Sequence, residues 1–184
     1  ILQLLVQGSM RTSWLLIPCV LESLLIPQQD ALRIITACVA LIAATSQGYR
    51  LSLFYRKGVL SEPMLWSLYC AFTWMIVGFL MIAVSMMTET PLPWLHAITV
   101  GGLLTMIISM MARISLGHTG RPILALRGMP AVFIALQLAA LVRISLQSSE
   151  GYLIAIILLL ISMVIFLSHY SPILLKPRSD NQPG

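Results

Sequence analysis

The sequence predicts an all-α protein, a polytopic transmembrane helix bundle with about five or six spanning helices. Of its 184 residues, 59% are apolar and only 9% are charged, whereas roughly 25% are charged in ordinary soluble domains. The mean hydropathy is +0.95, and the apolar residues gather in stretches of about 20, the length that crosses a bilayer as a helix. These numbers exclude a soluble globule and a disordered chain.

Each apolar stretch predicts one spanning helix. Residues 10–26 are the weakest candidate because Pro18 and Glu22 interrupt them, and residues 31–47 are short but sufficiently apolar. Four stretches have the full length, namely residues 63–87, 92–116, 129–146 and 152–170. Residues 171–184 follow as a tail. With no long loop, residues 1–184 are expected to form a single transmembrane helical domain, and a start inside an apolar stretch indicates a part of a longer protein.

The basic residues predict the orientation of these helices. When the connections are assigned alternately to the two sides, nine of the 11 Lys and Arg residues fall on one side and only Arg33 and Arg143 on the other. The positive-inside rule makes the first side cytoplasmic, which places the C-terminus there and explains the basic pI without nucleic acid. The nine are Arg11, Arg50, Arg56, Lys57, Arg113, Arg121, Arg127, Lys176 and Arg178. Glu22 is a candidate ion-pair partner for Arg143 or Arg33.

The stretch 92–116 contains the most informative side chains. At α-helical spacing His96, Met106, Met110 and Arg113 share one face, together with Thr99 and Leu103. On another face Gly101, Thr105 and Ser109 form a ladder of small residues, which predicts close packing against a second helix. His96 lies about one turn from the outer end. It is interpreted either as a hydrogen-bonding interfacial residue or as a ligand of a metal or haem.

The inner end of the same stretch carries a second group of polar residues. Gly117, Gly120 and Pro122 predict a helix end and a turn, which brings Arg113, His118 and Arg121 together. Two interpretations remain open, namely contact with lipid headgroups or a site for an anion such as haem propionates.

The positions of the three histidines along the chain give two further expectations. His96 and His118 are separated by roughly 30 Å of helix and cannot ligate one metal ion. His169 ends the last span and is a candidate neighbour of His118.

Other residue types carry weaker signals. Cys19, Cys38 and Cys70 lie far apart in apolar runs and are interpreted as structural thiols. The eleven methionines favour packing over copper ligation. The sequence has no phosphate-binding loop, dinucleotide fingerprint or nucleophile elbow, so it gives no indication of ordinary kinase or hydrolase chemistry.

Two segments, His96–Met106 and Arg113–Pro122, resemble the NnrS family of polytopic membrane proteins. The runs Glu62–Trp66 and Pro177–Gly184 are similar to the same family. The resemblance implies haem and copper, a bacterial inner-membrane location and a link to nitric oxide metabolism or nitrosative stress. It also implies that this chain is the C-terminal half of a longer protein, whose first half is absent.

Two positions differ from the family pattern. Tyr69 stands where the family commonly has a histidine, and Phe72 stands where it commonly has a tyrosine. The functional expectation therefore rests on four residues: His96 and His118 as metal ligands, and Arg113 and Arg121 beside them as further cofactor-binding residues.

The leading hypothesis is an NnrS-like haem and copper protein whose partners are the lipid bilayer, nitric oxide and the absent first half. The alternative hypotheses are a transporter or channel module without a redox cofactor, and a helical scaffold. Bound haem predicts visible absorption, whereas a transporter predicts solute flux without a chromophore.

Overall fold

The computed structural model describes residues 30–55, 58–177 and 179, and every regular element among them is a helix. The all-α prediction is confirmed. The predicted weak span, residues 10–26, lies outside the described residues, as do Cys19 and Glu22.

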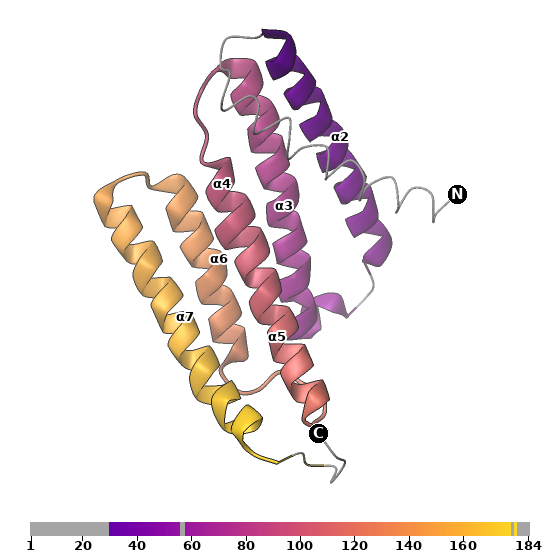
Figure 1. The fold of residues 1–184 in the computed structure, drawn as a ribbon, viewed down its shortest axis with the longest axis vertical. Coiled ribbons are helices and arrows are strands. Elements are labelled where there is room, and N and C mark those ends of the chain that lie inside the picture. Colours follow the sequence, from indigo (N-terminus) through magenta and orange to yellow (C-terminus); the bar gives the residue numbers. More distant parts are fainter. Residues whose placement is uncertain (1–29, 56–57, 178, 180–184) are drawn as a thin grey trace. The chain divides into compact units, whose positions relative to one another are not determined.

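The helices follow one another with short connections (Figure 1). Three consecutive elements, α4, η2 and α5, form one continuous helix from Trp94 to His118. The elements are α2 (Asp30–Phe54), η1 (Val59–Ser61), α3 (Pro63–Thr88), α4 (Trp94–His96), η2 (Ala97–Leu104), α5 (Thr105–His118), α6 (Met129–Ser145) and α7 (Ser149–Leu175).

Four of these helices are long and apolar enough to cross a membrane. They are α2, α3, Trp94–His118 and α7, while α6 is a shorter apolar helix of 17 residues. At 1.5 Å per residue, α6 spans roughly 25 Å, slightly less than the hydrocarbon core of a bilayer. The described part of the chain is therefore a helical bundle of the membrane-spanning type.

Two helices continue beyond the apolar stretches that predict them. Helix α2 runs to Phe54 rather than Gln47, so half of the expected loop after Gly48 is helical. Its last turns contain Arg50, whose guanidinium lies 5.3 Å from the centre of the Phe72 ring. Helix α7 runs to Leu175 with Pro172 inside it, although a proline removes one backbone donor.

The contacts of the chain group into two compact units. The first contains α2, the part of α3 from Phe72 onward, and the chain through Ile98. Its core packs alanines of α2 against larger side chains of α3, and such small residues let two helices approach closely. These residues are Ala40, Ala43, Ala44, Phe79, Ile82 and Ala83. An ion pair between Arg33 and Glu89 joins the beginning of α2 to the chain just after α3.

The second unit contains the beginning of α3, the helix from Thr99 to His118, α6 and α7. Helix α6 packs against both α5 and α7, and its neighbour α7 runs antiparallel to it (Figure 1). Phe133 of α6 meets the Trp66 ring edge-on at 5.9 Å, and Phe166 stacks on Tyr170 in α7. These aromatic contacts lie in one core with buried aliphatic residues of α5 and α6, namely Ile108, Leu116, Met129, Val132 and Leu136.

The hairpin between α6 and α7 shows how the sequence encodes a tight connection. Ser148 caps α7 by accepting a hydrogen bond from the Gly151 backbone nitrogen at 3.2 Å. A Cβ at Gly151 would lie 2.5 Å from the Leu146 carbonyl oxygen, so only glycine permits this approach.

The outer surface of α7 is apolar. Only a narrow stripe of α7 is buried, and it contains Ala155, Ser162 and Phe166. The other side exposes large aliphatic residues, which include Leu153, Ile157, Leu160, Val164 and Leu167. A surface this apolar is suited to lipid rather than water.

We predict that Gly78→Ala destabilises the protein. A Cβ at Gly78 would overlap the Ile98 side chain, so the two segments must separate. The expected cost is about 1–3 kcal/mol, measured as a lower melting temperature in mild detergent.

Gly48→Ala is the matched control for this prediction. A Cβ at this helical position meets nothing within 4 Å, so the alanine should stabilise α2 by about 0.5–1 kcal/mol. Equal melting temperatures for the two variants would contradict the close approach at Gly78.

Candidate functional site

The N-terminal end of the helix Trp94–His118 carries His96. This residue ends α4, its backbone nitrogen donates to the Pro93 carbonyl at 3.1 Å, and its side chain is half-buried. The imidazole is therefore held on a regular helix rather than on a loop, directly before η2.

Segment η2 is a π-helix of eight residues, Ala97–Leu104. In this rare form each backbone N–H bonds to the carbonyl five residues earlier, so each residue turns through a smaller angle than in an α-helix. His96 and Thr99 consequently fall out of line with Met110 and Arg113, which the sequence had placed on one face. The Gly101–Gly102 pair inside η2 was a signal for irregular backbone, but apolar periodicity alone gives no indication of a π-helix.

The small-residue ladder lies inside the second unit. Gly101 is buried, and Thr105 and Ser109 are fully buried. The Ser109 hydroxyl donates to the Ser67 hydroxyl at 2.9 Å, and the Gln137 side-chain amide donates to the Thr105 hydroxyl at 3.3 Å. The beginning of α3 and the middle of α6 thus both contact this side of the helix.

A pocket of about 350 Å³ lies at the C-terminal end of α5, the end that the sequence predicts to be the inner one. Arg113 and His118 provide its polar groups, and Gly117 forms part of its wall. The remaining lining is apolar and comes from Met110, Ile114 and Ile123. Arg113 is half-buried and makes no hydrogen bond or ion pair with any residue in the described ranges.

Arg121, the third residue expected at this place, contacts another element. Its Nη1 donates to the Ile173 carbonyl at 3.4 Å, near the end of α7. Ser179 adds a second link, because its hydroxyl donates to the Gly120 carbonyl at 2.8 Å. Arg121 therefore links the turn after α5 to α7, while Arg113 and His118 line the pocket.

His169 lies against the start of α6. Its Nδ1 is 2.8 Å from the Ile165 carbonyl, and a Cβ at Gly128, the residue before α6, would lie 3.3 Å from its ring. A carbonyl only accepts, so Nδ1 carries the proton. In these contacts His169 acts between α6 and α7 and does not line the pocket of His118.

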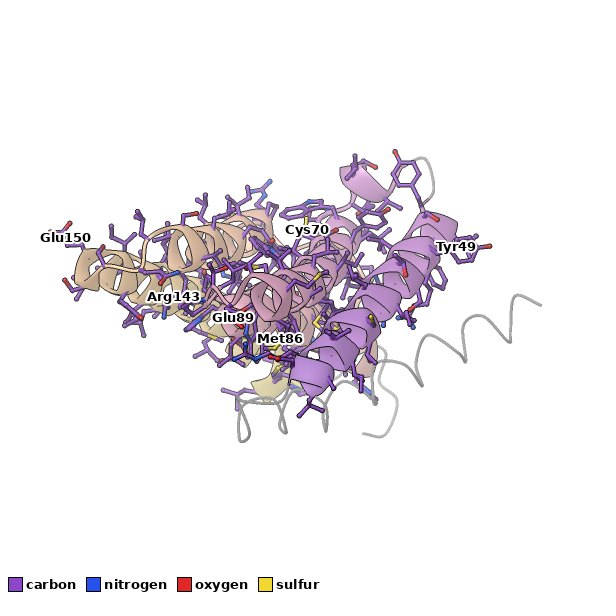
Figure 2. The ribbon with its side chains drawn as sticks, turned by 90° about the horizontal axis from the view of Figure 1, so that it is seen from above. Tyr49, Cys70, Met86, Glu89, Arg143 and Glu150 are labelled. Carbon is purple, nitrogen blue, oxygen red and sulfur yellow. The ribbon has the colours of Figure 1, made fainter. Side chains whose placement is uncertain are left out.

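Two arginines outside this pocket find local partners, each within its own unit. Arg33 pairs with Glu89, and the Arg143 guanidinium lies 3.6 Å from the centre of the Tyr152 ring. Figure 2 labels one residue of each contact, Glu89 and Arg143. Arg143 is buried, with 8% of its surface exposed, and this cation–π contact together with its position in the last turn of α6 stabilises the guanidinium there. Glu22, the partner expected from sequence, lies outside the described residues.

The described residues fit a haem or copper ion only in part. No three His, Cys, Asp or Glu side chains among them gather in one place, and Cys38 and Cys70 are free thiols. Each end of the helix Trp94–His118 offers one imidazole, which suffices for one axial ligand of haem iron. A protein copper site takes several ligands, and these residues alone do not supply them.

Comparison with known proteins gives one match. A family model described as NnrS protein matches residues 4–178. No curated protein and no solved structure matches the chain.

The ladder of small residues, Gly101, Thr105 and Ser109, leads to a prediction about helix packing. Gly101→Leu should lower the melting temperature in detergent, because a buried backbone position has no room for a large side chain. Ile107→Leu, on the exposed side of the same helix, should leave the melting temperature unchanged. If both variants melt like the unmodified protein, Gly101 does not lie in a helix contact.

Proposed function

The chain belongs to the NnrS protein family, and we propose that it is a haem and copper membrane protein of bacterial nitric oxide metabolism. The family match over residues 4–178 carries this proposal. The long apolar helices add that the protein is a multi-pass membrane protein. Haem, copper and nitric oxide come from what the family resemblance implies.

His96 is the proposed metal-facing residue. It is half-buried, it precedes the rare π-helical segment η2, and π-helical backbone is frequent at functional sites. A neutral imidazole is a good ligand for haem iron and for copper. A bound haem would supply an iron atom with a coordination position for a small diatomic molecule.

The chain's own contribution is to hold and orient this imidazole. The helix after His96 is continuous to His118, and the neighbouring Ala97 is fully buried. A ligand fixed on a packed helix keeps its direction, which a ligand on a loop does not. The other ligands of the proposed centre come from outside the described residues.

A transporter or channel module is the alternative function. It is favoured by the hydroxyl and amide groups buried inside the second unit, at Ser67, Ser109 and Thr105. Polar groups inside a membrane bundle mark solute paths in many transporters. Solute flux in vesicles without any visible absorption would favour this alternative.

The proposed orientation places the C-terminus in the cytoplasm. The distribution of Lys and Arg supports it, because the ends of α2, α5 and α7 that carry Arg50, Arg113 and Lys176 would share one side. The hairpin at Gln147 and the ion pair of Arg33 and Glu89 would then face the periplasm.

Reporter fusions test this orientation. A reporter fused after Gly184 should behave as cytoplasmic, and one inserted after the exposed Gln147 should behave as periplasmic. The site at Gln147 leaves the Arg33–Glu89 ion pair intact. The reverse pattern would overturn the proposed orientation.

Variants at the two ends of one helix test the metal proposal. In protein purified from bacterial membranes, His96→Ala should remove or alter the visible haem spectrum or lower the copper content. His118→Ala should leave the signal of the centre at His96 unchanged and alter only what is bound at the other end of the helix, because roughly 30 Å of helix separates the two imidazoles. Both variants are compared at equal amounts of folded protein.

Two outcomes would contradict this assignment. If His96→Ala keeps its full haem and copper content, His96 has a structural role. If the unmodified protein contains neither haem nor copper, the proposed function itself fails.

A further inference from the structure

We propose that the pocket at the inner end of α5 binds one anionic phospholipid of the adjoining leaflet. The phosphate would contact Arg113 and His118, and an acyl chain would lie along the exposed apolar side of α5. This inference goes beyond the proposed function and does not depend on bound haem or copper.

The first observation that supports a phosphate ligand is the positive charge in the pocket. The Arg113 guanidinium has five N–H donors, and within the described ranges none of them has a protein acceptor. No acidic side chain among the residues that the structure describes lines the pocket. A half-buried cation without a counter-charge is unfavourable, and a phosphate accepts hydrogen bonds from arginine in two-pronged geometry. The pocket is therefore complementary to a phosphate group.

The second observation that supports a phosphate ligand is the position of His118 on α5. On α5, Met110, Ile114 and His118 are spaced four residues apart and form one column, while Arg113 and Gly117 form the adjacent column. Gly117 leaves an open space between the two polar side chains. A Cβ there would meet only Ile123 Cδ1, at 3.9 Å.

The backbone carbonyls at this end of α5 do not oppose phosphate binding. The C-terminus of a helix carries partial negative charge, which repels anions. Here the Leu116 carbonyl accepts from the backbone nitrogens of Thr119 and Arg121, at 3.3 and 3.0 Å. A ligand in the pocket would meet the side chains of Arg113 and His118.

The apolar part of the pocket distinguishes a lipid from a free anion. Met110, Ile114 and Ile123 form half of the lining. The exposed side of α5 continues from there with Ile107 and Met111, which are 52% and 47% exposed. Basic pockets beside exposed apolar helix surfaces at the end of membrane helices are suited to anionic lipid headgroups with their chains in the bilayer.

A haem with its propionates fits this pocket less well than a phospholipid. Among the described arginines, Arg113 alone lines the pocket, and Arg121 instead donates to the Ile173 carbonyl. A volume of about 350 Å³ is at the lower end of the range for small-molecule sites. One phosphate with its glycerol matches one guanidinium and one imidazole.

Lipid binding by the full chain tests the proposal. The purified protein is exchanged into nanodiscs or mixed micelles that contain phosphatidylglycerol or phosphatidylcholine, and bound lipid is counted by native mass spectrometry. We expect one retained phosphatidylglycerol and no retained phosphatidylcholine. Arg113→Gln should weaken retention about tenfold, the loss expected when a charge-assisted hydrogen bond is removed.

Two further variants distinguish the effect of the Arg113 charge from the effect of the pocket's shape. Arg127→Gln removes the same charge from an exposed position outside the pocket and should retain lipid normally. Gly117→Leu keeps both polar groups but fills the space between them, so it should also lose the lipid. Melting temperatures close to that of the unmodified protein establish that each variant is folded.

Three results would overturn the inference. They are equal retention of the two lipids, equal behaviour of Arg113→Gln and Arg127→Gln, and displacement of the bound lipid by millimolar inorganic phosphate. The last result would identify a soluble-anion site. The haem spectrum is recorded separately, so a failure of the proposed function is distinguishable from a failure of lipid binding.

Discussion

A backbone that crosses hydrocarbon must satisfy its own hydrogen bonds, and most of this structure follows from that constraint. Even the irregular parts of the described spans keep helical bonding: η2 uses bonds to the fifth preceding carbonyl, and α7 continues through Pro172. Apart from the donor that Pro172 removes inside α7, the backbone groups without helical partners lie at the helix ends, and specific side chains meet some of them there. Ser148 caps α7, and Arg121 donates to a carbonyl near its other end. Polar chemistry is thereby concentrated at the ends of the helices.

The helices themselves were predictable because composition and length decide them. A stretch of about 20 apolar residues has no stable alternative to a helix in a membrane. The ends were less predictable, as the seven additional residues of α2 up to Phe54 show. Polar residues such as Arg50 mark the edge of the apolar core, but a helix does not need to stop there. Apolar periodicity also could not reveal η2, because a π-turn changes the angle per residue without changing composition.

The candidate site was predictable where it depends on neighbours in sequence and unpredictable where it depends on distant partners. Arg113 and His118 are five residues apart, little more than one helical turn, so both are expected at the same end of the helix. Arg121 bonds to the Ile173 carbonyl, 52 positions away, and no local pattern indicates that contact. The same holds for the ion pair between Arg33 and Glu89, which are 56 positions apart.

The second unit divides α5 into a packed side and an open side, and this division limits where a ligand can bind. Thr105 and Ser109 are occupied by side chains from α6 and α3, so a cofactor or lipid has no access to that side. Ile107, Met110 and Ile114 remain exposed on the other side. Arg113 lies between the two, half-buried and without a protein acceptor among the described residues. A cation in that position can contact lipid while it stays packed against the helix. His96, which precedes the π-helical segment, has a different set of neighbours. The two ends of one helix therefore offer two chemically separate places, and a ligand at one end need not affect the other.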